Sequence, residues 1–184
     1  MRTNKVKQLV INAMLAAICF VLAYFSLTFV NIKFTFESIP VHLGALFFGP
    51  AGGMAIGGIG TFLYQVLSYG VTVTTVLWIV PYILCGGFVG FVAKWKNFSL
   101  TRIQAIGLMV TGELIITLMN TGALYIDSQI YGYYHPTLIT GVLALRLLIC
   151  VIKAVAYGLI LPELVNTLRR VLRLEPALQK EFWK

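Results

Sequence analysis

Two long stretches of this sequence carry no charged residue. No Asp, Glu, Lys or Arg occurs between Lys7 and Lys33, and none between Glu37 and Lys94. The whole chain is 59% hydrophobic and 11% charged, with a mean hydropathy of +0.90, values far from those of soluble domains. A chain of 184 residues cannot bury so much apolar surface against itself alone, so lipid must cover part of it. The sequence therefore predicts an all-α integral membrane protein.

Breaks between the apolar segments predict six membrane helices in one domain that covers residues 1–184. Five of them are long enough to cross a hydrocarbon core of about 30 Å. The second is too short, and we expect it to be tilted or packed within the bundle. The predicted spans are residues 8–29, 38–49, 51–69, 73–94, 103–125 and 137–165, followed by a basic tail over 166–184.

The stretch around the short second helix organises the rest of the chain. Residues 31–38 alternate polar and apolar side chains, which predicts a short extended segment. Gly49-Pro50 then separates the second helix from the third, because proline lacks an amide donor and restricts the residue before it. After this break, Gly53-x-x-x-Gly57 predicts that neighbouring helices approach closely.

Most of the 14 Lys and Arg residues precede the first span, lie between the fourth and fifth, or follow the sixth. An even number of spans puts these segments on one side of the membrane, and the positive-inside rule makes that side cytoplasmic. Both termini are therefore predicted to be cytoplasmic. This orientation, together with anionic lipid of the inner leaflet, explains the net charge of +8 without a nucleic acid partner.

The sequence offers no set of residues for enzymatic chemistry. His42 and His135 stand apart from any paired metal-ligand motif, and no nucleophile elbow occurs. The glycine-rich run in the third span lacks the Lys-Ser/Thr of a phosphate loop. All three cysteines fall within spans and are interpreted as packing residues. We therefore predict a protein that is not an enzyme and uses neither a cofactor nor a metal.

Polar and aromatic side chains gather instead in the outer half of the predicted bundle. An amide inside a span needs a partner. An aromatic ring at this depth either stacks on a ligand or belongs to an interfacial belt, and both interpretations stay open. For the tyrosines between residues 131 and 134 we favour a belt or a loop lid. The residues predicted to bind a substrate are Tyr64, Gln65, Trp78, Asn120, Tyr125 and Arg146.

Arg146 is the most informative single residue. A guanidinium within a span is costly and usually faces the interior, a cavity or a partner charge. Its planar fork suits a carboxylate, which belongs either to a ligand or to Glu113 at a similar depth. Lys153 lies one heptad further along the same helix face, and we expect it to snorkel toward the inner headgroups.

Taken together, the order and spacing of these motifs resemble a known family. The extended segment is followed by SIPVHLGALFFGPAGGMAIGG, residues 119–121 read MNT near the outer end of the fifth span, and the last span holds Arg146 and later Pro162. This pattern resembles the substrate-binding S components of energy-coupling factor (ECF) transporters, closest to the folate and pantothenate group. The likeness covers about residues 8–168. The stretch TVTTVLWIVP departs from the folate-type pattern and leaves the substrate open.

The resemblance implies a six-helix protein of the bacterial cell membrane that captures a B-group vitamin from outside. It also implies two kinds of partner, a membrane-embedded coupling protein and two cytoplasmic ATPase subunits. The implied lid loop comprises Asn31, Lys33, Phe34 and Phe36. The implied docking face for the coupling protein is the small-residue pattern Ala13-x-x-x-Ala17, with Ala16 and Ala23 beside it.

Other interpretations remain open at this point. Within the same family, the ligand would be neutral, of the hydroxymethylpyrimidine or pyridoxine type, if Arg146 pairs with Glu113. A channel or scaffold subunit would explain the hydrophobicity but not a polar cluster confined to the outer half. A membrane enzyme would need a catalytic pair that the sequence does not provide.

Overall fold

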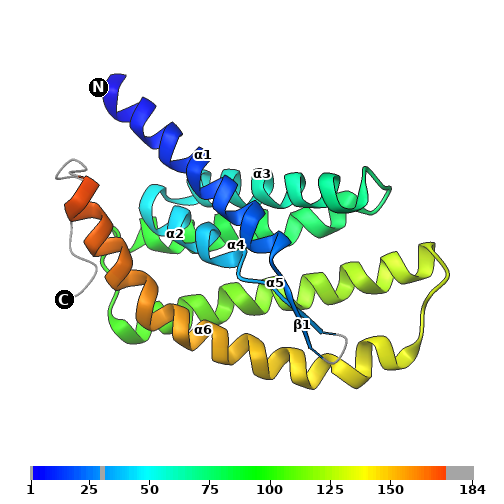
Figure 1. The fold of residues 1–184 in the computed structure, drawn as a ribbon. Helices are drawn as coiled ribbons and strands as arrows, with labels where there is room; N and C mark the ends of the chain where they lie inside the picture. Colours follow the sequence, from blue (N-terminus) through cyan, green and yellow to red (C-terminus); the bar gives the residue numbers. More distant parts are fainter. Residues whose placement is uncertain (1, 30–31, 173–184) are drawn as a thin grey trace.

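The described part of the chain forms six helices and one two-stranded antiparallel hairpin (Figure 1). The computed structural model describes residues 2–29 and 32–172. Along the chain the elements are α1 (Arg2–Tyr24), β1 (Leu27–Phe29), β2 (Ile32–Phe34), α2 (Ser38–Phe48), α3 (Pro50–Tyr69), α4 (Thr75–Trp95), α5 (Arg102–Ile130) and α6 (Pro136–Leu172). The prediction of six helices is confirmed.

The hairpin changes the predicted end of the first span. The sequence predicts that this span reaches residue 29, whereas α1 ends at Tyr24. Leu27 pairs instead with Phe34, and Phe29 with Ile32. Aromatic and β-branched residues fit a strand as well as a helix, so apolar character alone could not separate these two outcomes.

The last two helices are longer than predicted. α5 continues to Ile130, beyond the predicted end at residue 125. α6 continues to Leu172, so the first part of the predicted tail over 166–184 extends the last helix. The rest of that tail lies outside the described residues.

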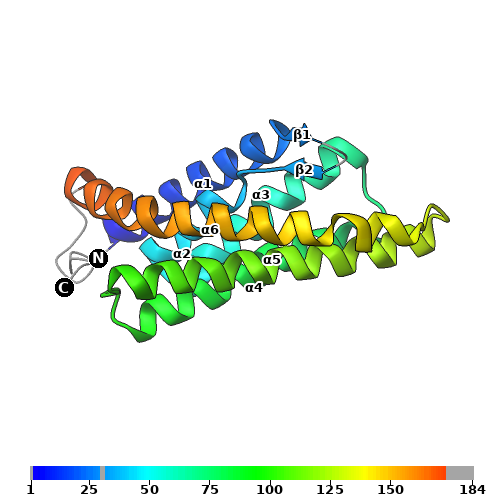
Figure 2. The same ribbon diagram turned by 90° about the horizontal axis from the view of Figure 1, so that it is seen from below.

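α2 lies at the centre of the bundle. Its 11 residues are almost all buried, and it contacts α1, α3, α4 and α6 (Figure 2). This burial confirms the prediction that the short helix packs within the bundle, as suits a helix that is hydrophobic all round. Gly49, with a φ of 76°, then turns the chain, and Pro50 opens α3 at a position where its missing N–H costs nothing.

Glycines bring the backbones of α3 and α4 into contact. A Cβ added at Gly53 would lie 2.6 Å from the carbonyl oxygen of Gly86, and one at Gly57 would lie 2.6 Å from that of Tyr82. The close approach predicted from Gly53-x-x-x-Gly57 is confirmed, and its partner helix is α4.

Replacing Gly86 with alanine should lower thermal stability clearly. The added methyl group would lie 2.4 Å from the backbone of Gly53, and such overpacking costs about 1–3 kcal/mol or more. Gly107→Ala is the matched control, because no heavy atom lies within 4 Å of a Cβ at Gly107. Unfolding of both variants in detergent, followed by fluorescence, measures the difference. A wild-type midpoint for Gly86→Ala would contradict this account of the interface.

Four of the described helices are long and apolar enough to cross a membrane, which makes the chain a multi-pass membrane protein. They are Val6–Tyr24, Thr75–Trp95, Arg102–Ile130 and Ile139–Leu168. The sequence predicts five such spans by length. The predicted span that is missing from these four is α3. It has 20 residues, but its glycines and polar side chains such as Gln65 lower its hydropathy.

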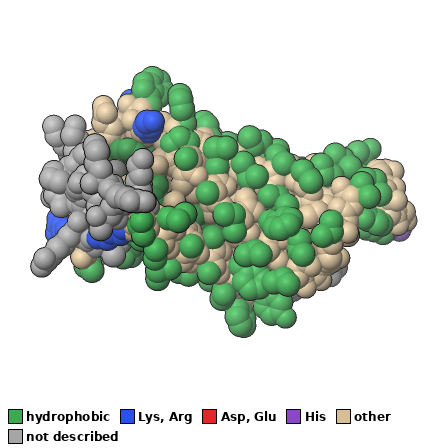
Figure 3. Space-filling model, turned by 90° about the horizontal axis from the view of Figure 1, so that it is seen from above, with side chains coloured by type: hydrophobic (Ala, Val, Ile, Leu, Met, Phe, Trp, Pro, Cys, Tyr) green, Lys and Arg blue, Asp and Glu red, His purple; other side chains and the backbone are tan. Residues whose placement is uncertain are grey.

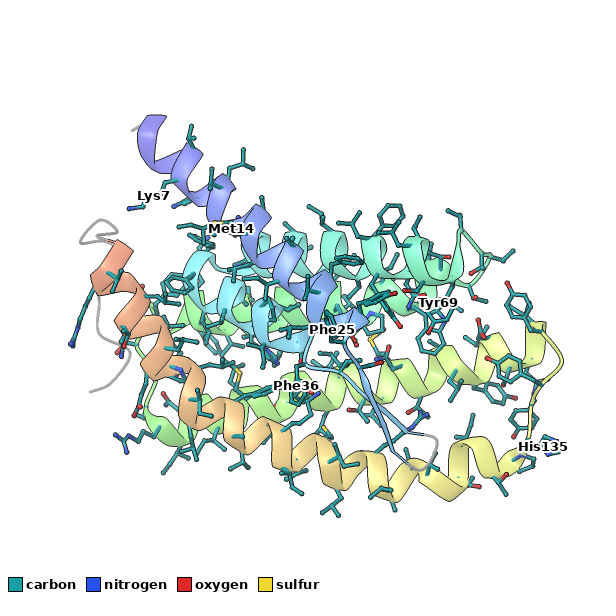
Figure 4. All side chains as sticks on the ribbon, viewed as in Figure 1. Lys7, Met14, Phe25, Phe36, Tyr69 and His135 are labelled. Atoms are coloured by element: carbon teal, nitrogen blue, oxygen red, sulfur yellow. The ribbon has the colours of Figure 1, made fainter. Side chains whose placement is uncertain are left out.

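The basic segments lie together at one end of the bundle. The start of α1, the end of α6 and the α4–α5 connection share that end (Figures 1 and 2), where Lys and Arg side chains gather on the face in Figure 3. Lys7 and His135 mark the two opposite ends (Figure 4). The prediction that the basic segments share one side is therefore confirmed. The assignment of that side as cytoplasmic stays a prediction. The end with the α3–α4 and α5–α6 connections is called the outer end below.

Candidate ligand-binding site

A cavity of about 620 Å³ lies in the outer half of the bundle. One wall comes from α3, α4 and their connection, and the other from α5 and α6. The segment that joins β2 to α2 contributes Thr35 and Glu37, and the start of α2 contributes Ser38. The volume falls within the usual range for small-molecule sites. The cavity therefore has the size of a binding site for a small molecule.

Five of the six residues predicted to bind a substrate line this cavity. They are Tyr64, Gln65, Trp78, Asn120 and Arg146, and they come from four different helices. Their binding roles stay predictions, but their convergence is a property of the fold.

Tyr125 is not among the lining residues, which corrects its predicted place. It follows Asn120 by five residues, and at 3.6 residues per turn the two point to different faces of α5. Its side chain is 46% exposed, and the centroid of its ring lies 5.5 Å from the centroid of the Tyr134 ring.

Aromatic side chains surround the outer part of the cavity. The Tyr64 and Tyr69 rings meet edge to face, and their hydroxyl oxygens are 3.1 Å apart. Tyr69 projects from the end of α3 toward α5 (Figure 4). In the α5–α6 connection, Tyr133 donates a hydrogen bond to Asp127. Partial burial and this bond raise the pKa of Tyr133 to about 12.

A buried ionic cluster forms the floor of the cavity. Glu113, only 1% exposed, lies with one carboxylate oxygen 3.1 Å from Nε2 of His42. Its other oxygen lies 3.1 Å from Nζ of Lys153. The three residues come from α5, α2 and α6, so the cluster joins three helices at one point.

This cluster excludes one alternative that the sequence left open and corrects one expectation. Glu113 pairs with Lys153 and His42, and not with Arg146. Lys153 does not snorkel toward headgroups, because its side chain is only 21% exposed and points to Glu113. The sequence did contain a signal, since charged residues inside spans usually pair with one another, but it could not show which partners the packing brings together.

Glu37 is a second buried carboxylate, and sequence reasoning missed it. It is 5% exposed and accepts hydrogen bonds from the Tyr82 hydroxyl and, at 2.8 Å, from Oγ1 of Thr35. Lys153 donates to the backbone oxygen of Thr35 at 3.1 Å. These bonds fasten the segment before α2 to α4 and α6, and so fix that part of the cavity wall.

Arg146 presents a half-buried cation to the cavity. Within residues 2–29 and 32–172 the ion pairs are His42–Glu113, Arg102–Glu163 and Lys153–Glu113. In that part of the chain Arg146 therefore has no carboxylate partner. A half-buried guanidinium without a counter-ion is suited to receive one from a ligand.

The described residues of the predicted lid lie on or beside the hairpin. Asn31 lies outside the described residues, while Lys33 and Phe34 belong to β2. Phe36 is 38% exposed and stands on the segment between the hairpin and α2 (Figure 4). Its neighbours Thr35 and Glu37 line the cavity. A lid function stays a prediction for these residues.

The predicted docking face on α1 is only partly exposed. Ala13 and Ala17 are exposed, as a partner surface requires. Ala16 is 3% exposed and Ala23 is fully buried, and the Ala16 carbonyl oxygen would lie 3.0 Å from a Cβ at Gly60 on α3. Ala16 and Ala23 therefore serve packing within the chain, which corrects the prediction for both.

The fold and the cavity define a multi-pass membrane protein with a polar site for a small molecule in its outer half. A sequence profile described as "ECF transporter, substrate-specific component" matches residues 7–169, and the chain belongs to this family. Its members are the substrate-binding subunits of transporters and are not ATPases themselves. The family prediction is confirmed, whereas the folate and pantothenate subgroup is not.

A solved structure has the same fold. It is the S-component for biotin from an ECF-type ABC transporter, determined at 2.1 Å. The TM-score is 0.66, with 16% sequence identity and 95% of each chain covered. At this identity the likeness concerns the fold alone. A comparison with curated protein sequences finds no match.

Proposed function

We propose that this chain captures a B-group vitamin with a carboxylate, of the pantothenate or folate type, from outside a bacterial cell. The observation that carries the proposal is Arg146, which lines the cavity without an ion pair in the described part of the chain. A ligand carboxylate would supply the missing counter-charge through the bidentate geometry that a guanidinium favours.

The surroundings of Arg146 support an anionic ligand. Glu113 and Lys153 form an ion pair. The two other lining carboxylates, Glu37 and Asp127, accept hydrogen bonds from tyrosine hydroxyls. Trp78 and Tyr64 supply aromatic surface in the wall, suited to cover the uncharged part of a vitamin. The alternative of a neutral ligand depended on an ion pair between Arg146 and Glu113. Glu113 pairs with Lys153 and His42 instead.

Identifying the small molecule that co-purifies with the protein tests this proposal. We expect mass spectrometry of an extract from wild-type protein, purified from cells in rich medium, to show a vitamin with a carboxylate. The same extract from Arg146→Gln should contain much less of it. Recovery of a pyrimidine or of pyridoxine from both proteins would count against an anionic ligand.

Transport requires partners that this chain does not contain. We propose that it delivers its ligand together with a membrane-embedded coupling protein and two cytoplasmic ATPase subunits. Membership of the family supports this, and so does the exposed pair Ala13 and Ala17 on α1. Small side chains let helices approach closely and slide without interlocking.

Replacing Ala17 with tryptophan should abolish vitamin uptake and leave ligand binding intact. The exposed indole would block docking on α1 without reaching the cavity. Uptake is measured in cells that carry the coupling module, and binding is measured on the purified variant. Ala16→Trp is the matched comparison: its side chain would collide with α3, so it should lose stability and not only uptake. Loss of binding in Ala17→Trp would refute the docking assignment.

A further inference from the structure

We infer that Asp127 forms a second polar subsite at the outer end of the cavity, where its carboxylate accepts a hydrogen bond from a hydroxyl or amine of the ligand. Asp127 is then a specificity-determining residue, and sequence reasoning did not single it out. This inference rests on the proposed binding of a ligand carboxylate at Arg146, and it adds a requirement on the opposite end of the ligand.

The Asp127 carboxylate is held in place with part of its accepting capacity unused. It is half-buried and lines the cavity, and the Tyr133 hydroxyl donates a hydrogen bond to its Oδ2. The ion pairs within residues 2–29 and 32–172 do not include it.

The other oxygen of the same carboxylate is open. Oδ1 of Asp127 accepts no hydrogen bond from the described part of the chain, and it does not belong to the fully buried atoms that lack a partner there. An ionised carboxylate has about four lone-pair sites, so it accepts further hydrogen bonds beside that of Tyr133. Oδ1 therefore offers an oriented acceptor to a molecule in the cavity.

The floor pair sets the distance between Asp127 and Arg146 along the cavity. Glu113 on α5 contacts Lys153 on α6, and the two helices run antiparallel (Figure 1). Arg146 precedes Lys153 by seven residues, and Asp127 follows Glu113 by fourteen. At 1.5 Å per residue, Arg146 lies about 10 Å outward of the floor pair and Asp127 about 21 Å. The cation and the open carboxylate therefore stand about 10 Å apart along the cavity that both line.

Opposite charges at two levels impose an order on the ligand. Its carboxylate is attracted by Arg146 and repelled by Asp127, and a carboxylate of the protein can only accept, so the group that meets Asp127 must be a donor. In pantothenate the terminal hydroxyl, and in folate the amine beside the benzoyl ring, stand eight bonds from a carboxyl carbon, about 10 Å in an extended chain. N-acetyl-β-alanine and N-benzoylglutamate keep the same carboxylate arms and lack these donors.

Calorimetric titration of each vitamin beside its truncated acid tests the inference, with displacement of the vitamin used where the truncated acid binds weakly. The quantity measured is the ratio of the two affinities. Asp127→Asn should lower this ratio at least about tenfold, the effect of losing one charge-assisted hydrogen bond. Arg146→Gln should weaken both acids of a pair. Glu163→Gln is the matched control, because it removes an exposed carboxylate that does not line the cavity, and it should keep the wild-type ratio.

The outcomes separate this inference from the proposed function. A wild-type ratio in a folded Asp127→Asn variant would overturn the inference and leave the carboxylate site at Arg146 standing, as would an equal fall of the ratio in Glu163→Gln. Tyr133→Phe removes the bond that orients the carboxylate, so its ratio should fall in part. If Asp127→Asn does not fold, an unchanged ratio in Tyr133→Phe overturns the inference. Failure of both vitamins and both truncated acids to bind wild-type protein would overturn both conclusions.

Discussion

Arg146→Gln should weaken binding of the carboxylate vitamin by at least about 30-fold and by up to about 5000-fold. This range corresponds to a loss of roughly 2–5 kcal/mol when a buried, charge-assisted contact is truncated. Glutamine can still donate one hydrogen bond, but it brings neither the charge nor the two-pronged geometry. Calorimetry on the purified variant, beside its unfolding midpoint, measures the effect.

Arg146→Lys is the matched control for this substitution. It keeps the charge and loses the planar fork, so its affinity should fall between those of the wild type and Arg146→Gln. Wild-type affinity in a folded Arg146→Gln variant would show that the guanidinium does not meet the ligand.

Lys153→Met should cause a large loss of stability. It leaves Glu113 in the core with His42 alone and removes the donor to the backbone oxygen of Thr35. Breaking a buried ion pair by removing one partner typically costs about 3–5 kcal/mol. The unfolding midpoint in detergent should therefore fall well below that of the wild type.

A double variant distinguishes an unpaired charge from a general packing defect. Lys153→Met combined with Glu113→Leu removes both charges, and replacing a buried pair with apolar groups is often nearly neutral. Most of the lost stability should return, and the unpaired Thr35 oxygen accounts for the remainder. A double variant as unstable as Lys153→Met alone would contradict the assignment of an ion pair.

The sequence was sufficient to predict the helical architecture. An apolar stretch of about 20 residues is stable across a bilayer as a helix, because the helix satisfies its own backbone polar groups. Gly49-Pro50 separates α2 from α3 for reasons that lie in the backbone itself. The polar residues of the site were also visible, because a side chain such as Asn120 or Arg146 inside a span needs a partner.

The partners of those polar residues could not be read from the sequence. Depth along a helix follows from its rise per residue, but its rotation and neighbours follow from packing. The sequence placed Glu113 at a depth similar to that of Arg146, whereas the packing of α5 on α6 sets it opposite Lys153, seven residues further along α6. The same limit explains Tyr125, which has the right depth and the wrong face of α5.

Two further differences between the sequence-based predictions and the structure have local causes. Residues 27–29 are apolar enough to continue the first membrane helix, but Thr28 and Phe29 also suit the strand that forms. Ala16 and Ala17 are identical in type, and only the packing of α1 on α3 shows that the first is buried and the second exposed.

The most direct test of the anionic site compares each acid with a neutral form of the same vitamin. Wild-type protein is titrated with pantothenate beside panthenol, and with folate beside its diamide. We expect at least one acid to bind at least about 30-fold more tightly than its neutral counterpart, since only the acid supplies a counter-charge to Arg146. Equal affinity within both pairs, or binding of pyridoxine or hydroxymethylpyrimidine alone, would contradict the central claim that Arg146 receives a carboxylate.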